Sequence, residues 1–163
     1  GYKLPKAMQR EFADVIQLIS ETEGGEVAPS RIMDAFRSEY TRAKGPYEFI
    51  SAKVEDDHTD EETRVTLVFK YHDREIISEG RGTGPIDAVK VAIKNGIGAA
   101  DFTIVDYDEH ALSEGSHAKA AAYIQMKDNK TGKIIFGVGV SGNITRASIR
   151  GVFSALNRLA RNE

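Results

Sequence analysis

The sequence predicts an α+β protein in which two tandem βββα units follow a small helical segment. Apolar and polar residues alternate in several short runs, as in strands that bury one face of a sheet. Two groups of such runs end at glycines that open an amphipathic helix. The two strand–glycine–helix segments superpose at an offset of 58 residues, which places Gly84 on Gly142 and Ile86 on Ile144. A repeated supersecondary unit of this kind predicts two copies of one fold.

The first part of the chain predicts two helices. Apolar residues recur at helical spacing between residues 5 and 23, Pro5 suits a first helical turn, and Gly24-Gly25 end the pattern. Ser30 can cap a second, shorter helix. The apolar stripe of that helix consists of Ile32, Phe36 and Tyr40.

Gly45-Pro46 interrupts the chain after this helical pair. We therefore expect a helical connector at residues 1–44 and a larger unit at residues 45–163. The connector is expected to lie outside the core of the larger unit. The apolar stripe of its first helix needs a packing partner, and consists of Phe12, Ile16 and Ile19.

The larger unit begins with three runs of strand character at residues 49–54, 65–72 and 75–78. Asp73-Arg74 forms a tight turn between the second and third runs. The glycine loop at residues 80–85 then leads into a helix over residues 85–94. Asn95-Gly96 is expected to terminate this helix.

The second half repeats this order. Its strand-like runs lie at residues 102–107, 118–126 and 133–140. A turn at Asn129–Gly132 joins the last two runs. Ser141-Gly142-Asn143 opens the final helix, whose apolar residues are Ile144, Ala147, Ile149, Val152, Phe153, Leu156 and Leu159.

The charge balance argues against nucleic acid and membrane partners. The chain has 22 Lys and Arg against 25 Asp and Glu, and its basic residues are scattered rather than clustered. Acidic residues gather at 55–57 and 60–62, where we expect a solvated hairpin loop. No apolar stretch approaches the roughly 20 residues of a membrane span. The absence of cysteine fits a reducing compartment, so we expect a cytoplasmic protein.

The glycine loop at residues 80–85 admits three interpretations. A dinucleotide-binding loop is disfavoured, because Pro85 occupies the third glycine position of GxGxxG and the unit lacks βαβ alternation. A plain turn between strand and helix is the second interpretation. The third is a binding loop, since glycines let a ligand approach the backbone and a helix N-terminus favours a carboxylate or phosphate. Together with residues 141–143 and Asp87, such a loop could hold both ends of a zwitterion.

Candidate catalytic and metal-binding residues are sparse. His110 and His117 are seven residues apart, and the acids near them are scattered over a strand end and a loop. This spacing does not predict convergent metal ligands. Gly132-Lys133 lacks the rest of a phosphate-binding loop, and no Ser/His/Asp arrangement stands out. We expect no catalytic residue, metal or cofactor in this chain, which disfavours an independent enzyme.

Taken in order, several stretches resemble the C-terminal regulatory region of the 2-isopropylmalate synthases, which act in leucine biosynthesis. These stretches are residues 82–88, 106–111, 118–123, 137–148 and 154–158. Leu4-Pro5 and Val15-Ile16-Gln17 also resemble the helical connector that precedes this region in one branch of the family. The resemblance spans nearly the whole chain, and the motifs are specific as an ordered set.

The resemblance implies a regulatory domain that helps the enzyme form a homodimer and binds L-leucine, or a related branched-chain amino acid, for feedback inhibition. The family's catalytic barrel, which uses acetyl-CoA and a divalent metal, is absent from this chain and would be its partner. The positions that match the family's ligand site are Gly82, Gly84, Pro85, Ile86, Asp87, Tyr107, His110, Ala111, Ala118, Ile144 and Thr145.

Within this site we expect helix N-termini to hold the ligand carboxylate, and Asp87 or backbone carbonyls to hold its ammonium group. Apolar residues would shape the pocket for the ligand side chain, namely Ile86, Ala111, Ala118 and Ile144. Thr83 replaces the Asn usual between the loop glycines, which motivates an alternative, a dimerisation scaffold without a ligand. Because citramalate synthases have a similar region, an isoleucine sensor is a further alternative.

Overall fold

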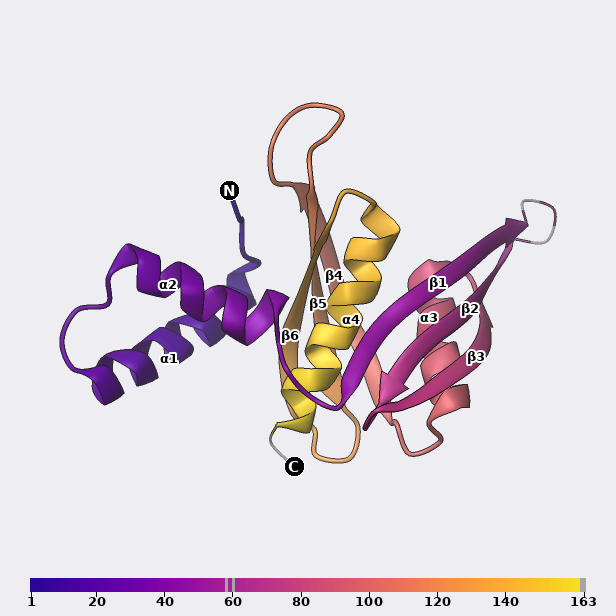
Figure 1. Ribbon diagram of the computed structural model, residues 1–163, viewed down its shortest axis with the longest axis horizontal. Helices are drawn as coiled ribbons and strands as arrows, with labels where there is room; N and C mark the ends of the chain where they lie inside the picture. Colours follow the sequence, from indigo (N-terminus) through magenta and orange to yellow (C-terminus); the bar gives the residue numbers. More distant parts are fainter. Residues whose placement is uncertain (58, 60, 162–163) are drawn as a thin grey trace.

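Two three-stranded antiparallel sheets, each followed by a helix, form the larger part of the chain (Figure 1). The computed structural model describes every residue except 58, 60, 162 and 163. The first unit comprises β1 (Tyr47–Asp57), β2 (Glu62–Tyr71), β3 (Arg74–Gly82) and α3 (Pro85–Gly96). The second comprises β4 (Phe102–Ala111), β5 (Ala120–Asp128), β6 (Ile134–Ser141) and α4 (Ile144–Ala160). The predicted α+β class with two βββα units is confirmed.

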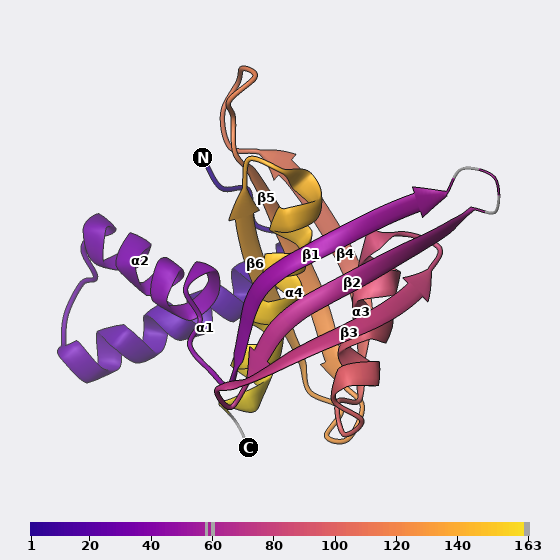
Figure 2. The ribbon, with the colours of Figure 1, turned by 45° about the vertical axis from the view of Figure 1, so that its right-hand side comes forward.

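Two residues with positive φ form the tight turn that joins β2 to β3. His72 and Asp73 have φ values of 49° and 63°, which suit the two-residue hairpin between β2 and β3. The β1–β2 hairpin projects away from the rest of the molecule (Figure 2). The acidic run of the sequence lies mostly in the strand ends of this hairpin rather than in its loop, and Asp60 lies outside the described residues.

Glycines on the last strand of each unit let that strand approach its helix closely. A Cβ atom built on Gly80 of β3 would lie 2.1 Å from the Ala88 carbonyl oxygen of α3. One built on Gly139 of β6 would lie 1.9 Å from the Ala147 carbonyl oxygen of α4. Both distances are too short for a real side chain, so strand and helix backbones are in direct contact at these positions.

These equivalent contacts correct the repeat inferred from the sequence by one residue. Gly80 corresponds to Gly139, an offset of 59 rather than 58. The helix starts agree, because the residues that precede α3 and α4 are Gly84 and Asn143. Residue identity favours the pairing of Gly84 with Gly142, whereas the equivalent backbone positions are Gly84 and Asn143.

Side chains from both units share one apolar core. Leu67 and Phe69 of β2, Ile93 of α3, and Phe153 of α4 are among its buried members. The Phe153 ring packs against Phe69 with ring centroids 5.6 Å apart. Since α4 contributes to a core that also contains the first sheet, the two units are held together by apolar burial, the dominant favourable term in folding.

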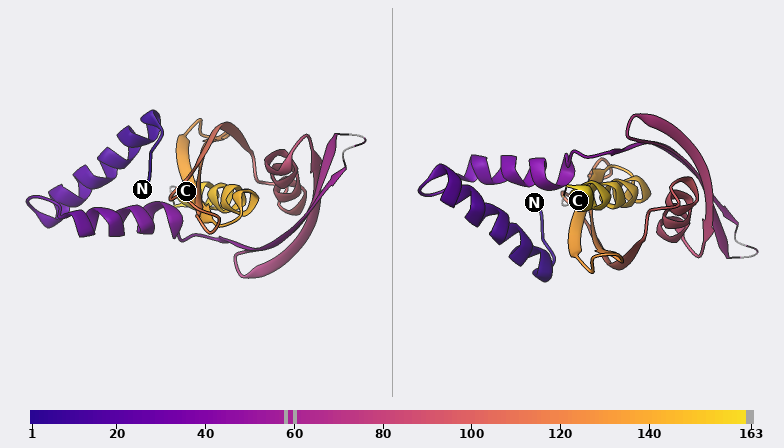
Figure 3. Two further views of the ribbon diagram at one scale, coloured as in Figure 1. Left: turned by 90° about the horizontal axis from the view of Figure 1, so that it is seen from above. Right: turned by 90° about the horizontal axis from the view of Figure 1, so that it is seen from below.

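The N-terminal helices cover the other face of the second sheet. They comprise α1 (Lys6–Glu23), α2 (Pro29–Phe36) and a π-helical turn, η1 (Arg37–Thr41), and they project as a V from the second unit (Figure 3). Their side chains form a second apolar cluster with β5 and β6, whose buried members are Met8, Phe36, Tyr40, Ala121, Tyr123, Phe136 and Val138.

The helical segment therefore contributes no buried residue to the first cluster but provides much of the second. In the apolar stripe of α1, Phe12 packs within the helical segment itself, against Phe36 and Tyr40. The division of the chain at residue 45 stays a prediction. Among the described residues, no helix is long and apolar enough to cross a membrane.

One local expectation about the helices is wrong and another is confirmed. Ser30 does not cap α2, because Pro29 already begins the helix and Ala28 precedes it without a side-chain hydrogen bond. The helix α3 ends at Gly96 as expected, two residues beyond Lys94, and Gly96 is its last helical residue. The absent side chain serves packing, because a Cβ atom at Gly96 would lie 2.9 Å from Ile76 Cγ2.

The contact between β6 and α4 yields the first prediction. Gly139→Ala places a methyl group against the α4 backbone, so strand and helix must separate. We expect a loss of unfolding free energy of about 1–3 kcal/mol or more, measured by chemical denaturation. Gly142→Ala is the matched control, because its Cβ meets no atom within 4 Å. Equal stability of the two variants would show that β6 and α4 do not pack as described.

Candidate functional site

A pocket of about 420 Å³ lies where the two helix N-termini meet β4. The loop after β3 and the start of α3 form one wall, the first turns of α4 form another, and β4 contributes two side chains. The lining residues are Thr83, Gly84, Pro85, Ile86, Asp87, Tyr107, Glu109, Ile144, Thr145 and Ser148. The repeat thus brings two equivalent helix starts to one cavity, although they are about 59 residues apart in sequence.

Seven of the residues expected at a ligand site line this pocket. They are Gly84, Pro85, Ile86, Asp87, Tyr107, Ile144 and Thr145. Gly82, His110, Ala111 and Ala118 are not among the lining residues. The structure therefore gathers the glycine loop, Tyr107 and the α4 start, and leaves the end of β4 and the following loop outside the pocket.

Gly82 and His110 each have another role in the fold. A Cβ atom on Gly82 would lie 2.3 Å from Asp87 Oδ2, so this glycine makes room for the Asp87 side chain. His110 lies on the opposite face of β4 from Tyr107 and Glu109, because side chains alternate along a strand. Its Nε2 atom is 2.8 Å from the Tyr123 hydroxyl, and burial raises the pKa of Tyr123 to about 12.

Three lining residues were missed in the sequence, namely Thr83, Glu109 and Ser148. Simple periodicity could have found two of them. Glu109 is two residues beyond Tyr107 and so shares its face of β4. Ser148 is four residues beyond Ile144 and so shares its face of α4.

Asp87 fixes the glycine loop against the start of α3. Its Oδ2 atom accepts a hydrogen bond from the Thr83 N–H at 3.1 Å, and its Oδ1 atom lies 3.1 Å from Lys90 Nζ. The Thr83 hydrogen bond, followed by Lys90, holds the pKa of the Asp87 carboxyl below its ordinary value. Both oxygens of Asp87 are thus engaged within the chain.

Gly84 leaves the loop open rather than strained. Its φ of −162° is extended backbone that any residue adopts, and a Cβ built there would meet no atom within 4 Å. The absence of a side chain therefore keeps space free beside the backbone at the mouth of the pocket.

The start of α4 is fixed by hydrogen bonds. The Asn143 side chain accepts from the Arg146 N–H at 2.9 Å and caps the helix. The Ser148 hydroxyl hydrogen-bonds with the Tyr107 hydroxyl at 3.1 Å and with the Ile144 carbonyl oxygen at 3.0 Å. These bonds orient Tyr107, so β4 and α4 meet the pocket in a defined arrangement.

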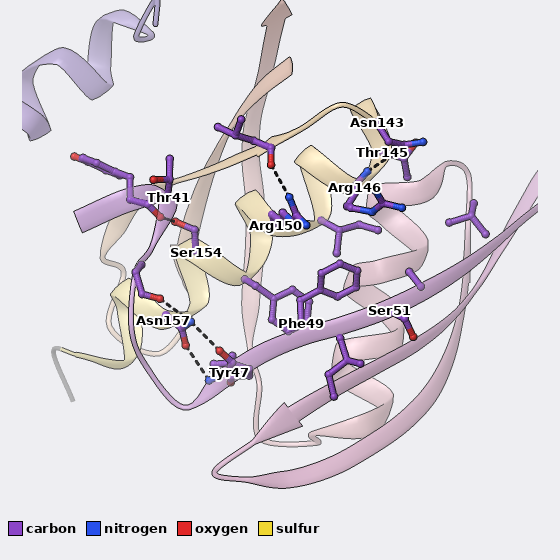
Figure 4. A pocket seen from close by; sticks show the side chains of 18 residues that line it. Thr41, Tyr47, Phe49, Ser51, Asn143, Thr145, Arg146, Arg150, Ser154 and Asn157 are labelled. Atoms are coloured by element: carbon purple, nitrogen blue, oxygen red, sulfur yellow. Dashed lines mark hydrogen bonds between the residues drawn. The ribbon is translucent and has the colours of Figure 1, made fainter. Parts of the chain in front are cut away.

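A larger groove of about 730 Å³ runs between β1 and α4 (Figure 4). Several of its polar side chains already bond within the chain. Asn157 accepts from the Tyr47 N–H at 2.9 Å, and Arg150 donates to the Val140 carbonyl oxygen at 2.8 Å. None of the described residues that line it is acidic, so no side-chain carboxylate faces it. The smaller pocket is therefore the better site for a ligand with both charges.

Comparison with known proteins decides the family. The model of the LeuA allosteric (dimerisation) domain matches residues 26–160. The chain belongs to this family. The match begins within the helical segment and extends to the last residue of α4.

The curated relatives of this chain are longer proteins named 2-isopropylmalate synthase. The chain is 38% identical to 2-isopropylmalate synthase of Corynebacterium glutamicum over 160 residues, covering 97% of this chain and 25% of that protein. It is 40% identical to the Mycobacterium ulcerans enzyme, covering 99% of this chain and 28% of the enzyme. The chain thus spans about a quarter of the length of these relatives, and the expected resemblance to 2-isopropylmalate synthase is confirmed.

The described residues contain no group of three or more His, Asp or Glu side chains that could hold a metal ion. His110 and His117 differ in their surroundings, because His110 bonds to Tyr123 whereas His117 lies in the loop between β4 and β5. The polar side chains that line the pocket are the hydroxyls of Thr83, Tyr107, Thr145 and Ser148 and the carboxylates of Asp87 and Glu109.

The Asp87 bonds yield a prediction of pH dependence. A carboxyl whose pKa is lowered by folding stabilises the fold above its unfolded pKa, and this contribution is lost as the pH falls through the folded pKa. Asp87→Asn should therefore lower the melting temperature at pH 7, and by less than the roughly 2–4 °C that 1 kcal/mol produces in a domain of this size, because solvent screens the Asp87 side chain, which is 39% exposed. The difference from wild type should shrink below about pH 4.

The control is Glu114→Gln, which alters an exposed acid in the loop after β4. It should leave the melting temperature unchanged at both pH values. A deficit of Asp87→Asn that is equally large at pH 7 and pH 3.5 would contradict a role for the Asp87 charge.

Proposed function

We propose that this chain is the regulatory domain of a cytoplasmic 2-isopropylmalate synthase and binds L-leucine in the pocket between α3 and α4. The observation that supports this most directly is the convergence of two helix N-termini on one cavity that also has apolar walls. Helix N-termini attract carboxylates because their first N–H groups lack intrahelical partners and carry the positive end of the helix dipole.

The pocket offers separate places for the three parts of leucine. The first turns of α3 and α4 would bind the carboxylate. Ile86 and Ile144 lie on the two walls and would pack against the isobutyl group. The ammonium group needs a carboxylate, and Asp87 is a poor candidate because Thr83 and Lys90 engage both of its oxygens.

Glu109 is the better acceptor for the ligand's ammonium group. It lines the pocket from β4, it is exposed, and no ion pair joins it to another described residue. Binding would give this carboxylate a cationic partner while the helix N-termini hold the opposite end of the ligand. We therefore assign the ammonium contact to Glu109 in place of the Asp87 of the sequence-based expectation.

Dimerisation and inhibition complete the proposal. The family's own description names both an allosteric and a dimerisation role. We propose that two copies of the domain associate as a homodimer, and that leucine binding feeds back on a catalytic barrel elsewhere in the same polypeptide. The chain would serve as the sensor, and the barrel would supply the synthase reaction.

Leucine binding should raise the melting temperature. Ligand that binds only the folded state stabilises it by about 2.7 kcal/mol at one hundred times the dissociation constant. Titration with leucine, isoleucine and valine side by side should give the largest shift with leucine. Gly84→Val fills the open space at the pocket mouth and should abolish the shift, whereas Gly98→Val, also in open space but away from the pocket, should not.

No shift at millimolar leucine in a dimeric sample would contradict leucine sensing and leave the dimerisation scaffold as the better account. A larger shift with isoleucine would instead support a sensor of the citramalate synthase type.

The role of Glu109 gives a separate prediction. 4-Methylpentanoic acid has the carbon skeleton and carboxylate of leucine but no ammonium group. Wild type should bind leucine more tightly than this acid, and Glu109→Gln should reduce that preference by about tenfold or more, since hydrogen bonds between charged groups contribute about 1.5–3 kcal/mol. Asp108→Asn, on the opposite face of β4, is the control. Calorimetry showing an unchanged preference in Glu109→Gln would refute the assignment.

A further inference from the structure

Arg158, near the end of α4, is buried in contact with the N-terminal helices. It is only 7% exposed, and its guanidinium donates to Glu39 Oε1 of η1 at 2.9 Å and to the Phe136 carbonyl oxygen of β6 at 2.6 Å. The same group pairs with the Glu11 carboxylate of α1 and lies 4.4 Å from the centroid of the Tyr40 ring. One side chain thus joins α1, η1, β6 and α4, and we call this cluster the Arg158 joint.

Neighbouring bonds reinforce the Arg158 joint. Ser154, one turn earlier on α4, donates to the Tyr40 carbonyl oxygen at 2.6 Å and accepts from the Val138 N–H at 3.1 Å. Arg161 lies 3.3 Å from Glu39 Oε2. The helical segment is therefore attached to the second unit in two ways. Hydrogen bonds and ion pairs join it to α4, and apolar side chains join it to β5 and β6.

The Arg158 joint is costly in free energy. Removing charges from water costs several kcal/mol per ion, and a buried ion pair often stabilises a fold no more than apolar residues of the same volume. Burial raises the pKa of Glu11 above its ordinary value even though Arg158 is its partner. The Tyr40 hydroxyl is buried and has no hydrogen-bond partner among the described residues. A joint built only for stability would not need these features.

The backbone at the joint is also unusual. Residues Arg37–Thr41 form a π-helical turn, and such turns occur frequently at functional sites. Buried polar clusters are best attested where they specify one arrangement among alternatives. A buried ionic cluster beside a π-helical turn therefore suits a contact that fixes the position of the helical segment.

The helix α4 connects this joint to the pocket. Ile144, Thr145 and Ser148 line the pocket at its start, and Arg158 lies fourteen residues beyond Ile144, about 21 Å along the helix axis. Every residue from Ala147 to Leu159 except Arg150 is buried. Because nearly all of this stretch is packed against its neighbours, we expect α4 to move as one rigid body. A displacement of its N-terminus would then also displace its C-terminus.

We propose that α4 couples the pocket to the helical segment, and that Arg158 is the positioning residue through which ligand binding restricts the orientation of α1. This inference rests on the proposed function, because it requires a ligand in the pocket. In this proposal the effect of the ligand passes along α4 and through the buried Arg158 side chain. The helical segment changes its orientation in response.

The test measures a distance rather than stability. Because the chain has no cysteine, Leu18→Cys on α1 and Lys133→Cys in the β5–β6 turn provide two unique positions for spin labels. Leu18 is 64% exposed and is not one of the residues of the Arg158 joint, so labelling it leaves the residues of the joint unchanged. Double electron–electron resonance is recorded with the labelled chain diluted into excess unlabelled protein, so that label pairs within one chain dominate.

Saturating leucine should narrow the distance distribution in the otherwise wild-type chain. In Arg158→Met the narrowing should be lost while leucine still raises the melting temperature. Arg150→Met, the one exposed position within the buried stretch of α4, should respond like wild type. If Arg158→Met fails to fold, a triple variant with Glu11→Gln, Glu39→Gln and Arg158→Met removes the joint's charges together and should give the same loss.

The outcomes separate the two proposals. A chain that binds leucine by melting temperature yet keeps an unchanged distance distribution would overturn the coupling alone. Narrowing that persists in a folded Arg158→Met or triple variant would also overturn it. A chain that binds no leucine would overturn the proposed function and, with it, the coupling that depends on that function.

Discussion

The close contact between the last strand and the helix of each unit is the constraint on which the site depends. Gly80 and Gly139 let strand and helix backbones touch, at points where any side chain would collide with a helix carbonyl. The direction of each helix is thereby fixed relative to its sheet, and so is the place where the helix begins. Because both units use the same contact and share one apolar core, their helix N-termini meet in one pocket. The pocket is therefore a consequence of repetition, and neither unit forms it alone.

The two buried clusters of the fold differ in the interactions that stabilise them. The core between the units is apolar and depends on burial of aliphatic and aromatic side chains such as Leu67 and Phe153. The contact of the N-terminal helices with β5, β6 and α4 adds a buried ionic joint centred on Arg158 to its apolar cluster. An apolar core tolerates small adjustments, whereas bonds to a guanidinium fork demand a particular geometry. This difference assigns stability to the first cluster and placement of the helical segment to the second.

Much of the fold could be predicted from the sequence, because strand alternation and helical spacing report directly on which face is buried. The site could be predicted only in part. Gly84 was expected because it belongs to a glycine loop that opens a helix, and Ile144 because it matches the family's ligand site, and both line the pocket. The register of the repeat was wrong by one residue, since Asn143 and not Gly142 precedes α4. His110 and Glu109 are adjacent in sequence yet face opposite sides of β4, and the expected set included His110 although strand alternation from Tyr107 favours Glu109. The engagement of Asp87 by Thr83 and Lys90 depends on a loop conformation that no local pattern specifies.

A crystal structure of the chain grown with leucine would show whether the paired helix N-termini form one amino-acid site. We expect density for leucine between α3 and α4, with the carboxylate at the first-turn N–H groups, the ammonium group near Glu109 and the isobutyl group against Ile86 and Ile144. Leucine bound in the groove between β1 and α4, or bound in the pocket with its carboxylate facing away from both helix N-termini, would contradict this expectation.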